Sequence, residues 1–401
     1  MKYIVILGDG MADEPQEALG GRTPLEAART PAMDALAARA QIGLLQTIPE
    51  GMSPGSDTAN LAVLGYDPRR FYTGRSPLEA LSIGAPMKET DVALRCNLVT
   101  LSEKEDCYEE KHLIDHSSDE ISTQDAAILL DAVRQEFQSE VYQFYTGTSY
   151  RHCVIWAQGE RAELEPPHDH LTEKIGPYLP QNTELCDMMK RSYEILAAHP
   201  LNLARKEQGL HPANGCWFWG AGTKPALVSF SQKYGKKGVM ISAVDLLKGI
   251  AVGAGMRNVF VPGANGGLHT NYEGKAQAAV DALLKEGADF VYVHLEGPDE
   301  MGHQGSLERK MQAIEYLDDR VIRIIREQMD ASGEPYRMLI LPDHPTPIRL
   351  RTHTGDPVPY LLYDSTKQLG EGRSYCEKTA KESGIFQKEG YRIMDVLLEQ
   401  E

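Results

Sequence analysis

The chain has 401 residues, of which 42% are apolar, and a formal net charge of −17 at pH 7. This length and apolar content are enough for a large buried core and for two domains. The acidic balance argues against nucleic acid or an anionic membrane surface as a partner, because both require a basic face. A small anionic substrate remains compatible with this charge if divalent metal ions, held by some of the acidic residues, supply positive charge locally.

Neither a membrane segment nor a targeting signal is evident. No apolar run approaches the ~20 residues of a membrane span, and the apolar stretch near the first residue is too short for a signal peptide. The six cysteines are scattered, without CxxC pairs, which is typical of a reducing compartment. We therefore expect a globular cytoplasmic protein, and the sequence leaves its oligomeric state open.

Short apolar runs alternate with amphipathic stretches along most of the chain. Runs of Val, Ile and Leu without alternation indicate strands buried on both faces, as in a parallel sheet covered by helices. The predicted fold class is therefore α/β with a mostly parallel sheet. Strands are predicted within residues 2–10, 238–242, 258–263, 290–297 and 337–344, and helices at 25–40, 243–255, 276–287 and 308–329.

Residues 91–185 differ from the rest of the chain. They begin with a charge-rich stretch, continue with strand-like segments at 141–147 and 151–157, and end in a proline-rich stretch. We expect a smaller α+β domain here, inserted into a discontinuous core domain formed by residues 1–90 and 186–401. The prolines concerned are Pro166, Pro167, Pro177 and Pro180.

Carboxylate and imidazole side chains follow several of the predicted strands. Open parallel sheets bind ligands beyond the carboxyl ends of their strands, and these side chains suit Mn²⁺, Mg²⁺ or Zn²⁺. Six such groups exceed the needs of one ion, so they favour a two-metal site of the kind that clamps a phosphoryl group. They are Asp9, Asp299, His303, Asp343, His344 and His353.

Each of these residues also has an ordinary structural explanation. Asp9 would serve as a turn or cap residue, Asp299 as a helix N-cap, and His303 or His353 as a surface histidine. The recurrence of the pattern at several strand ends favours the metal site. The segment "VGAGMRN" resembles half of a dinucleotide-binding fingerprint, but it follows a predicted helix rather than a strand.

The segment "PGSDTANLAVLGYDP", residues 54–68, places Ser56 on a Pro-Gly turn at the start of a predicted helix. This position suits a nucleophile that accepts a phosphoryl group, because the N–H groups of a helix N-terminus favour phosphate. No histidine lies nearby in sequence to act as its base, but a metal ion bound to the serine oxygen would stabilise the alkoxide directly. The structural alternative is that Ser56 simply caps the helix.

A series of motifs resembles the cofactor-independent phosphoglycerate mutases, specifically the short archaeal-type branch within the alkaline phosphatase superfamily. In chain order they are "GDGM", "PGSDTANLAVLGYDP", "YTGRSPLEALSIG", "SYRH", "ISAVDLLKGIA", "TNYEGKA", "EGPDEMGH", "PDH" and "THT". The resemblance covers nearly the whole chain. It implies an alkaline-phosphatase-like core, an inserted domain that clamps the substrate, and interconversion of 2-phosphoglycerate and 3-phosphoglycerate through a phosphoserine, without bisphosphoglycerate.

The same resemblance implies a set of ligands. Two divalent ions are expected, Mn²⁺ first, with Mg²⁺, Zn²⁺ or Co²⁺ as alternatives. One would be held by Asp9, Ser56, Asp343 and His344, and the other by Asp299, His303 and His353. The basic residues Arg75, Arg151, His152 and Lys248 are candidate substrate ligands, although each is equally well explained as an ordinary surface charge.

One segment departs from the family pattern. Residues 115–123 read "DHSSDEIST", where archaeal-type mutases tend to show "DRRAGRIST", so His116, Asp119 and Glu120 replace basic residues. Either this is a surface loop that has drifted, or the acceptor differs. Bacterial relatives of this branch have been proposed as homoserine phosphotransferases, and carboxylates would pair with an ammonium group. A metal-binding module without catalysis is a third reading, which the retention of Ser56 beside a full ligand set disfavours.

Overall fold

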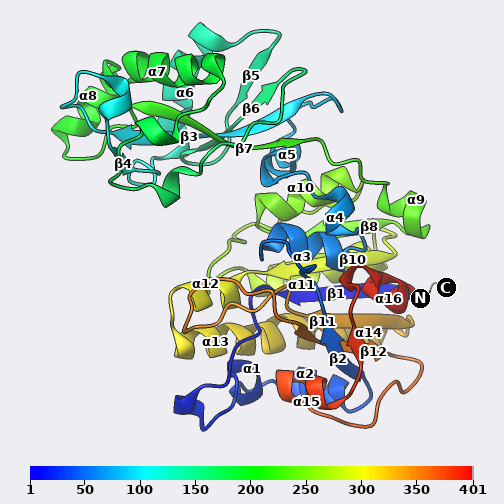
Figure 1. The fold of residues 1–401 in the computed structure, drawn as a ribbon. Coiled ribbons are helices and arrows are strands. Elements are labelled where there is room, and N and C mark those ends of the chain that lie inside the picture. Colours follow the sequence, from blue (N-terminus) through cyan, green and yellow to red (C-terminus); the bar gives the residue numbers. More distant parts are fainter. Residues whose placement is uncertain (400–401) are drawn as a thin grey trace. The chain divides into compact units, whose positions relative to one another are not determined.

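The computed structural model describes residues 1–399, and the chain divides into two compact units (Figure 1). Unit 1 consists of Met1–Tyr72 and Leu227–Glu401, and unit 2 of Thr73–Ala226. The insert expected at residues 91–185 lies within unit 2, which also includes residues 73–90 and 186–226. Unit 2 is thus continuous in sequence and interrupts unit 1.

Unit 1 is built on an eight-stranded sheet with the order β13-β2-β12-β11-β1-β10-β8-β9. Its central strands β11, β1, β10 and β8 are parallel, whereas β12 runs antiparallel to both β11 and β2. This sheet confirms the predicted α/β class with mostly parallel strands. The strands are β1 (Lys2–Gly8), β2 (Gln41–Leu45), β8 (Gly238–Ile241), β9 (Arg257–Asn258), β10 (Phe290–Leu295), β11 (Tyr336–Leu341), β12 (Val358–Asp364) and β13 (Phe386–Gln387).

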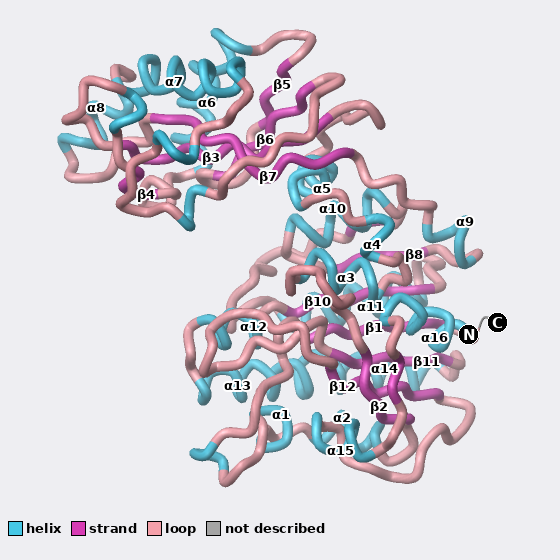
Figure 2. The backbone as a smooth tube through the Cα atoms, in the orientation of Figure 1, coloured by secondary structure: helices cyan, strands magenta, loops and turns pink. Residues whose placement is uncertain are grey.

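Helices cover both faces of this sheet (Figures 1 and 2). On one face, alternate strand residues such as Ile4, Val291 and Ile340 form a core with α2, α11, α13 and α14. On the other face, Tyr292 of β10 meets α3, and Arg337 of β11 meets α16. The helices are α1 (Pro24–Ala27), α2 (Pro31–Ala37), α3 (Ser56–Val63), α4 (Pro68–Phe71), α9 (Phe230–Tyr234), α10 (Asp245–Gly253), α11 (Tyr272–Leu284), α12 (Gly297–His303), α13 (Leu307–Leu317), α14 (Arg323–Ser332), α15 (Glu377–Glu382) and α16 (Ile393–Leu398), with short turns η1 (Glu17–Leu19), η5 (Asp318–Ile322) and η6 (Gly390–Arg392).

Three predicted elements differ in the structure. The helix expected at 25–40 is split into α1 and α2, because Pro31 starts a new helix and cannot donate a backbone hydrogen bond within a continuous one. The strand expected at 258–263 shrinks to β9, which pairs only with β8. The helix expected at 308–329 is α13 and α14 joined by a π-helical turn, η5.

Unit 2 contains a five-stranded antiparallel sheet in which β3 is central. Strand β3 is buried along its whole length because both of its faces are covered. Leu94 and Leu98 face the core shared with α6 and α7, whereas Ala93 faces α5. The elements are β3 (Val92–Leu101), β4 (Leu113–Asp115), β5 (Tyr142–Tyr145), β6 (Arg151–Trp156), β7 (Gly215–Thr223), α5 (Arg75–Ser82), α6 (Thr123–Phe137), α7 (Thr183–Ala197), α8 (Pro200–Glu207), η2 (Tyr108–Glu110), η3 (Pro167–Asp169) and η4 (Gly176–Tyr178).

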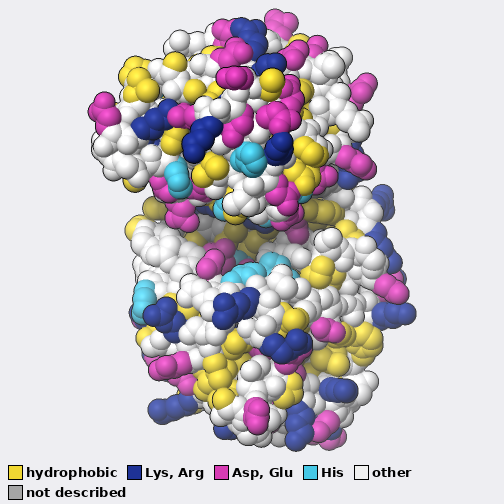
Figure 3. Space-filling model, turned by 60° about the vertical axis from the view of Figure 1, so that its left-hand side comes forward, with side chains coloured by type: hydrophobic (Ala, Val, Ile, Leu, Met, Phe, Trp, Pro, Cys, Tyr) yellow, Lys and Arg dark blue, Asp and Glu magenta, His cyan; other side chains and the backbone are white. Residues whose placement is uncertain are grey.

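The surface carries both signs of charge. Acidic and basic side chains are interspersed on the face drawn in Figure 3, so the net negative charge is spread over that face rather than concentrated in one field. Among residues 1–399, no helix combines the length and the apolar character needed to cross a bilayer.

Candidate active site

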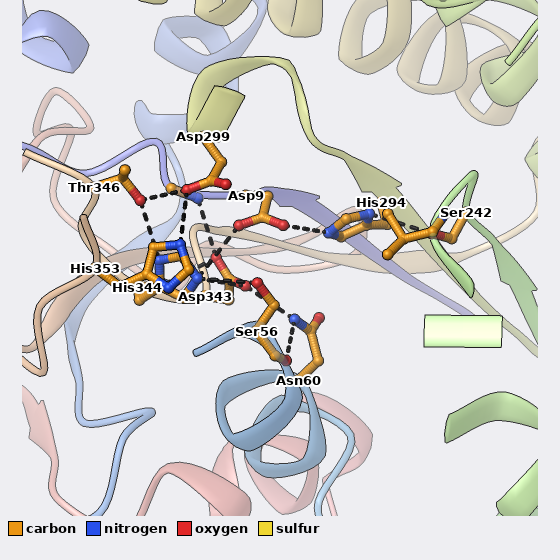
Figure 4. Close-up of polar contacts among 12 residues, drawn as sticks. Asp9, Ser56, Asn60, Ser242, His294, Asp299, Asp343, His344, Thr346 and His353 are labelled. Carbon is orange, nitrogen blue, oxygen red and sulfur yellow. Dashed lines mark hydrogen bonds and ion pairs between the residues drawn. The ribbon is translucent and has the colours of Figure 1, made fainter. Parts of the chain in front are cut away.

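The ends of three adjacent strands position most of the predicted site residues. Strands β1, β10 and β11 are parallel neighbours, so their carboxyl ends share one edge of the sheet. Asp9 follows β1 directly, Asp343 follows β11, and Asp299 lies in α12, just after β10. The sheet therefore brings together side chains that are hundreds of residues apart in sequence (Figure 4).

Asp9, Asp343 and His344 form a buried group whose potential ligand atoms all lie within 4.8 Å of one another. The Nε2 atom of His344 is 3.5 Å from Oδ1 of Asp9 and 3.4 Å from Oδ2 of Asp343. The Oγ atom of Ser56 lies 3.1 Å from the same nitrogen. The four residues that the resemblance allots to one ion are therefore close together in the structure.

Asp299, His303 and His353 form an adjacent and more exposed group. The Nε2 atoms of His303 and His353 lie 3.2 Å and 3.4 Å from the carboxylate oxygens of Asp299, and the two nitrogens are 2.9 Å apart. The rings of His344 and His353 stack with their centroids 3.9 Å apart. The two predicted ligand sets are thus contiguous, with His344 between them.

The carboxylate of Asp9 is poorly compensated. Burial raises the pKa of Asp9 well above its ordinary value, and the nearby carboxylates of Asp343 and Asp299 raise it further. Among the described residues, Oδ1 of Asp9 is buried and has no hydrogen-bond partner. A divalent cation would bind this oxygen and offset the mutual repulsion, so the donor set fits a hard or borderline metal ion.

The imidazole nitrogens converge in a way that also fits a cation. His303 donates its Nδ1–H to the carbonyl oxygen of Arg351 at 2.9 Å, so in the neutral ring Nε2 carries the lone pair. That lone pair faces Asp299 and His353. The hydrogen bond to Asp299 raises the pKa of His303 to about 9, as expected for an imidazole that faces a carboxylate.

Ser56 is the first residue of α3, and its side chain is available for chemistry. The N-cap position belongs to Gly55, which has no side chain and an extended φ of −176°. The reading of Ser56 as the N-cap of this helix is therefore wrong. The backbone N–H groups of the first helical turn lack partners within the helix, so they favour an anion that arrives at this end.

Neutral hydrogen-bond donors hold the three carboxylates, and the sequence prediction missed all of these donors. Each donor is buried and bonds one oxygen of its carboxylate. The pairs are His294 with Asp9 at 2.9 Å, Asn60 with Asp343 at 3.0 Å, and Thr346 with Asp299 at 2.5 Å.

The protonation of His294 follows from its surroundings. Burial lowers the pKa of His294 to about 3, so the ring is neutral. The hydroxyl of Ser242 accepts the N–H of Val244 at 3.0 Å and donates to Nδ1 of His294 at 3.3 Å. The ionised carboxylate of Asp9 only accepts hydrogen bonds, so the ring proton sits on Nε2, 2.9 Å from Asp9. Two signals in the sequence point to these donors: His294 stands near the end of a predicted strand, and Asn60 follows Ser56 by one helical turn.

The predicted substrate ligands lie in both units. Lys248 lies on α10 of unit 1 and pairs with Asp245 at 3.1 Å. Arg75, the first residue of α5, pairs with Glu79 at 2.9 Å. Arg151 is exposed at the start of β6.

His152, the fourth predicted substrate ligand, is buried. Burial lowers its pKa to about 3, and its Nδ1 accepts the N–H of Gly147 at 3.2 Å. It is therefore a neutral imidazole in the interior of unit 2. Lys248 thus belongs to unit 1 and the other three residues to unit 2, and the binding roles of all four stay predictions.

The acidic residues that replace the family's basic stretch have partners within unit 2. Asp119 accepts the backbone N–H of His211 at 2.7 Å, and its other oxygen lies 2.9 Å from the imidazole of that residue. Asp115 joins them in an exposed group. Glu120 is exposed and lies, like Asp119, in a left-handed backbone conformation. The carboxylate of Asp119 is thus already paired with a residue of the same unit.

Known proteins resemble the chain along its whole length. A family model described as 2,3-bisphosphoglycerate-independent phosphoglycerate mutase matches residues 37–202. A protein of that name from Methanosarcina acetivorans is 47% identical over 389 residues, covering 96% of each chain. A Geobacter sulfurreducens protein, named a probable enzyme of this kind, is 47% identical and spans both chains completely.

Two solved structures also resemble the chain over nearly its whole length. A protein from Pyrococcus horikoshii shares 29% identity at a TM-score of 0.82, covering 100% of this chain and 98% of its own. A cofactor-independent phosphoglycerate mutase from Thermoplasma acidophilum shares 25% identity at a TM-score of 0.68, covering 100% and 99%. With this similarity, and with the sheet edge described above, the chain belongs to the family of 2,3-bisphosphoglycerate-independent phosphoglycerate mutases, which are isomerases.

Proposed function

We propose that this protein interconverts 2-phosphoglycerate and 3-phosphoglycerate, with Ser56 as the temporary carrier of the phosphoryl group. Full-length relatives at 47% identity carry the mutase name. The observation that carries the proposal is the position of the Ser56 hydroxyl, 3.1 Å from His344 and beside a buried group of carboxylates. A serine there would serve little structural purpose, since Gly55 is the N-cap of the helix.

Two divalent ions complete the proposed site. Asp9, Ser56, Asp343 and His344 would hold one, and Asp299, His303 and His353 would hold the other, with Mn²⁺ preferred over Mg²⁺, Zn²⁺ or Co²⁺. When bound, such ions favour the ionised serine oxygen and offset the charge of the phosphoryl group. The unpartnered Oδ1 of Asp9 and the convergent nitrogens of His303 and His353 support this assignment.

The residues of the chain carry out the transfer of the phosphoryl group as follows. The Ser56 oxygen attacks phosphorus, so an O–P bond forms at serine while the O–P bond of the substrate breaks. Over the whole step, the proton of the serine hydroxyl is transferred to the departing oxygen of the substrate. The N-terminal end of α3, where Ser56 and Asp57 are the first helical residues, would bind the phosphoryl oxygens through backbone N–H groups. The return step repeats this exchange at the other hydroxyl of the same glycerate, so the net reaction is an isomerisation.

Homoserine as the acceptor is the less favoured reading. It relied on Asp119 and Glu120 being available for an ammonium group. Asp119 is instead bonded to His211 of the same unit. The curated relatives described above carry mutase names, so phosphoglycerate remains the proposed substrate.

A coupled assay tests this proposal. Protein loaded with Mn²⁺ is given 3-phosphoglycerate without bisphosphoglycerate, and formation of 2-phosphoglycerate is followed. Asp343→Asn should lose most of the activity, whereas Asp318→Asn, which alters an equally buried carboxylate bonded to the backbone of α2, should retain it. Absence of turnover by metal-loaded parent protein would overturn the proposal, and so would equal activity of the two variants.

A further inference from the structure

Asn60 connects three parts of unit 1 that belong to different segments of the chain. It lies in α3, one turn after Ser56, and its side chain is completely buried. Its Nδ2 donates to Oδ2 of Asp343 at 3.0 Å and to the carbonyl oxygen of Ser56 at 2.8 Å. Its Oδ1 accepts the hydroxyl of Tyr292, in β10, at 2.5 Å (Figure 4 shows the first two bonds).

These partners determine which way the amide faces. A carboxylate and a carbonyl oxygen only accept hydrogen bonds, so the NH₂ group must face Asp343 and Ser56. Burial raises the pKa of Tyr292 well above its ordinary value, so its hydroxyl keeps the proton that it donates to Oδ1. An aspartate at position 60 would place a carboxylate oxygen against the acceptor oxygens of Asp343 and Ser56. An aliphatic residue would make none of these hydrogen bonds.

We propose that Asn60 is a positioning residue that fixes the spacing between the Asp343 carboxylate and the serine at the start of α3. Asp343 receives further hydrogen bonds at Oδ1, from the N–H groups of Gly10 and His344 at 3.1 Å and 2.9 Å. Asn60 is the partner that ties its other oxygen to the serine helix. The inference rests on the proposed function, because it takes Ser56 as the phosphoryl acceptor and Asp343 as a metal ligand.

The consequence is a graded effect on metal binding and catalysis. Removing a residue that orients a metal ligand typically costs 10–100-fold in affinity or activity. A shift of the serine relative to its ligand would chiefly lower kcat, since the effect falls on the reacting geometry rather than on substrate binding. A purely structural asparagine would lower stability without either effect.

Two variants separate these possibilities. Asn60→Leu keeps the approximate size of the side chain but leaves the Tyr292 hydroxyl without its acceptor, which destabilises the fold. Adding Tyr292→Phe removes that stranded hydroxyl, so the double variant should regain part of the lost thermal midpoint. Neither variant restores the bond to Asp343.

Asn202 offers a matched control in unit 2. It is equally buried, donates two hydrogen bonds to the carbonyl oxygens of Leu196 and Ala213, and accepts one from the N–H of Ala213. Asn202→Leu therefore breaks the same number of bonds. It should lower the thermal midpoint while leaving metal affinity as in the parent.

The experiment titrates each metal-free protein with Mn²⁺ by calorimetry and measures kcat and KM separately. We expect Mn²⁺ affinity about 10–100-fold weaker in both Asn60 variants, with kcat reduced and KM little changed. Parent-like Mn²⁺ affinity and kcat in the double variant would overturn the inference and leave the mutase proposal intact. Weakened Mn²⁺ affinity in the Asn60 variants, in a protein without mutase turnover, would support the positioning role and defeat the proposed function instead.

Discussion

Lys310 and Asp13 form an ion pair that is completely buried in unit 1, and breaking it should destabilise that unit strongly. Both side chains are 0% exposed, with Nζ and Oδ2 2.8 Å apart. The ammonium group also donates to the carbonyl oxygens of Ala12 at 3.2 Å and Thr346 at 2.9 Å. The pair thus ties together the segments that follow β1 and β11, and Thr346 in turn holds Asp299.

The expected magnitude follows from this geometry. Lys310→Met keeps the aliphatic part of the side chain but leaves a buried carboxylate and two carbonyl oxygens without their donor. Removing one partner of a buried pair costs about 3–5 kcal/mol, a large share of the ~5–15 kcal/mol that stabilises a domain. Adding Asp13→Asn should recover part of the loss, because it removes the uncompensated charge while an amide oxygen remains to accept backbone N–H groups.

The positions of the tryptophans allow the two units to be followed separately. The tryptophans of the chain, Trp156, Trp217 and Trp219, all belong to unit 2. In denaturant unfolding, their fluorescence reports unit 2, whereas far-UV circular dichroism reports both units. The part of the dichroism transition that has no counterpart in tryptophan fluorescence reports unit 1. Lys310→Met should shift that part to a lower denaturant concentration.

An exposed ion pair supplies the comparison. Arg349 and Glu14 are 2.9 Å apart with side chains 66% and 42% exposed, so solvent screens their interaction. Arg349→Met should leave the unfolding transition nearly unchanged. If Lys310→Met moved the unit 1 transition no further than Arg349→Met, the reasoning about the buried pair would be refuted.

Three further predictions concern metal, pH and substrate. Chelation should lower the thermal midpoint and added Mn²⁺ should raise it with saturation, because a ligand that binds only the folded state stabilises it; a midpoint indifferent to Mn²⁺ would contradict the two-metal site. Burial raises the pKa of Asp318 from 3.8 to about 6. The stabilisation that the protonated carboxyl gives the folded state is therefore complete below about pH 4. As the pH rises through 6 it is lost, and the free energy of unfolding falls by at most about 3 kcal/mol. Unfolding titrations of Asp318→Asn should show a flatter pH dependence over that range, and a slope equal to that of the parent would count against this explanation. Replacing Asp119 and Glu120 with Asn and Gln should leave kcat/KM for phosphoglycerate equal or improved, and a marked fall would show that the pair assists the substrate.

The parts of the fold that the sequence predicted well are those set by local pattern. The uninterrupted apolar run that ends at Gly8 is buried on both faces of the sheet, as such a run requires. The break at Pro31 was missed, although its signal was equally local, since proline cannot continue a helix. The strand expected at 258–263 is shorter for a non-local reason, because a strand needs a partner and the pairing of this segment with β8 ends at Asn258.

In the candidate site, too, the residues set by local sequence were predictable and those that depend on distant partners were not. Asp9, Asp343 and His344 were predictable because they follow strands directly, and the ends of adjacent parallel strands meet. Asn60 and His294 were missed because their roles depend on partners 283 and 285 residues away in the chain. His152 looked like a surface ligand beside Arg151, but β6 is buried on both faces from His152 onward.

The most direct test of the central claim is to trap the phosphoryl group on the protein. Mn²⁺-loaded protein is mixed with 3-phosphoglycerate, quenched in acid during turnover, digested and examined by mass spectrometry for phosphopeptides. The account predicts phosphate on Ser56 in the parent, and neither phosphopeptide nor turnover in Ser56→Ala, with the fold and Mn²⁺ binding at the Asp299 group retained. Parent-like turnover by Ser56→Ala, or phosphate found at another residue during turnover, would contradict it.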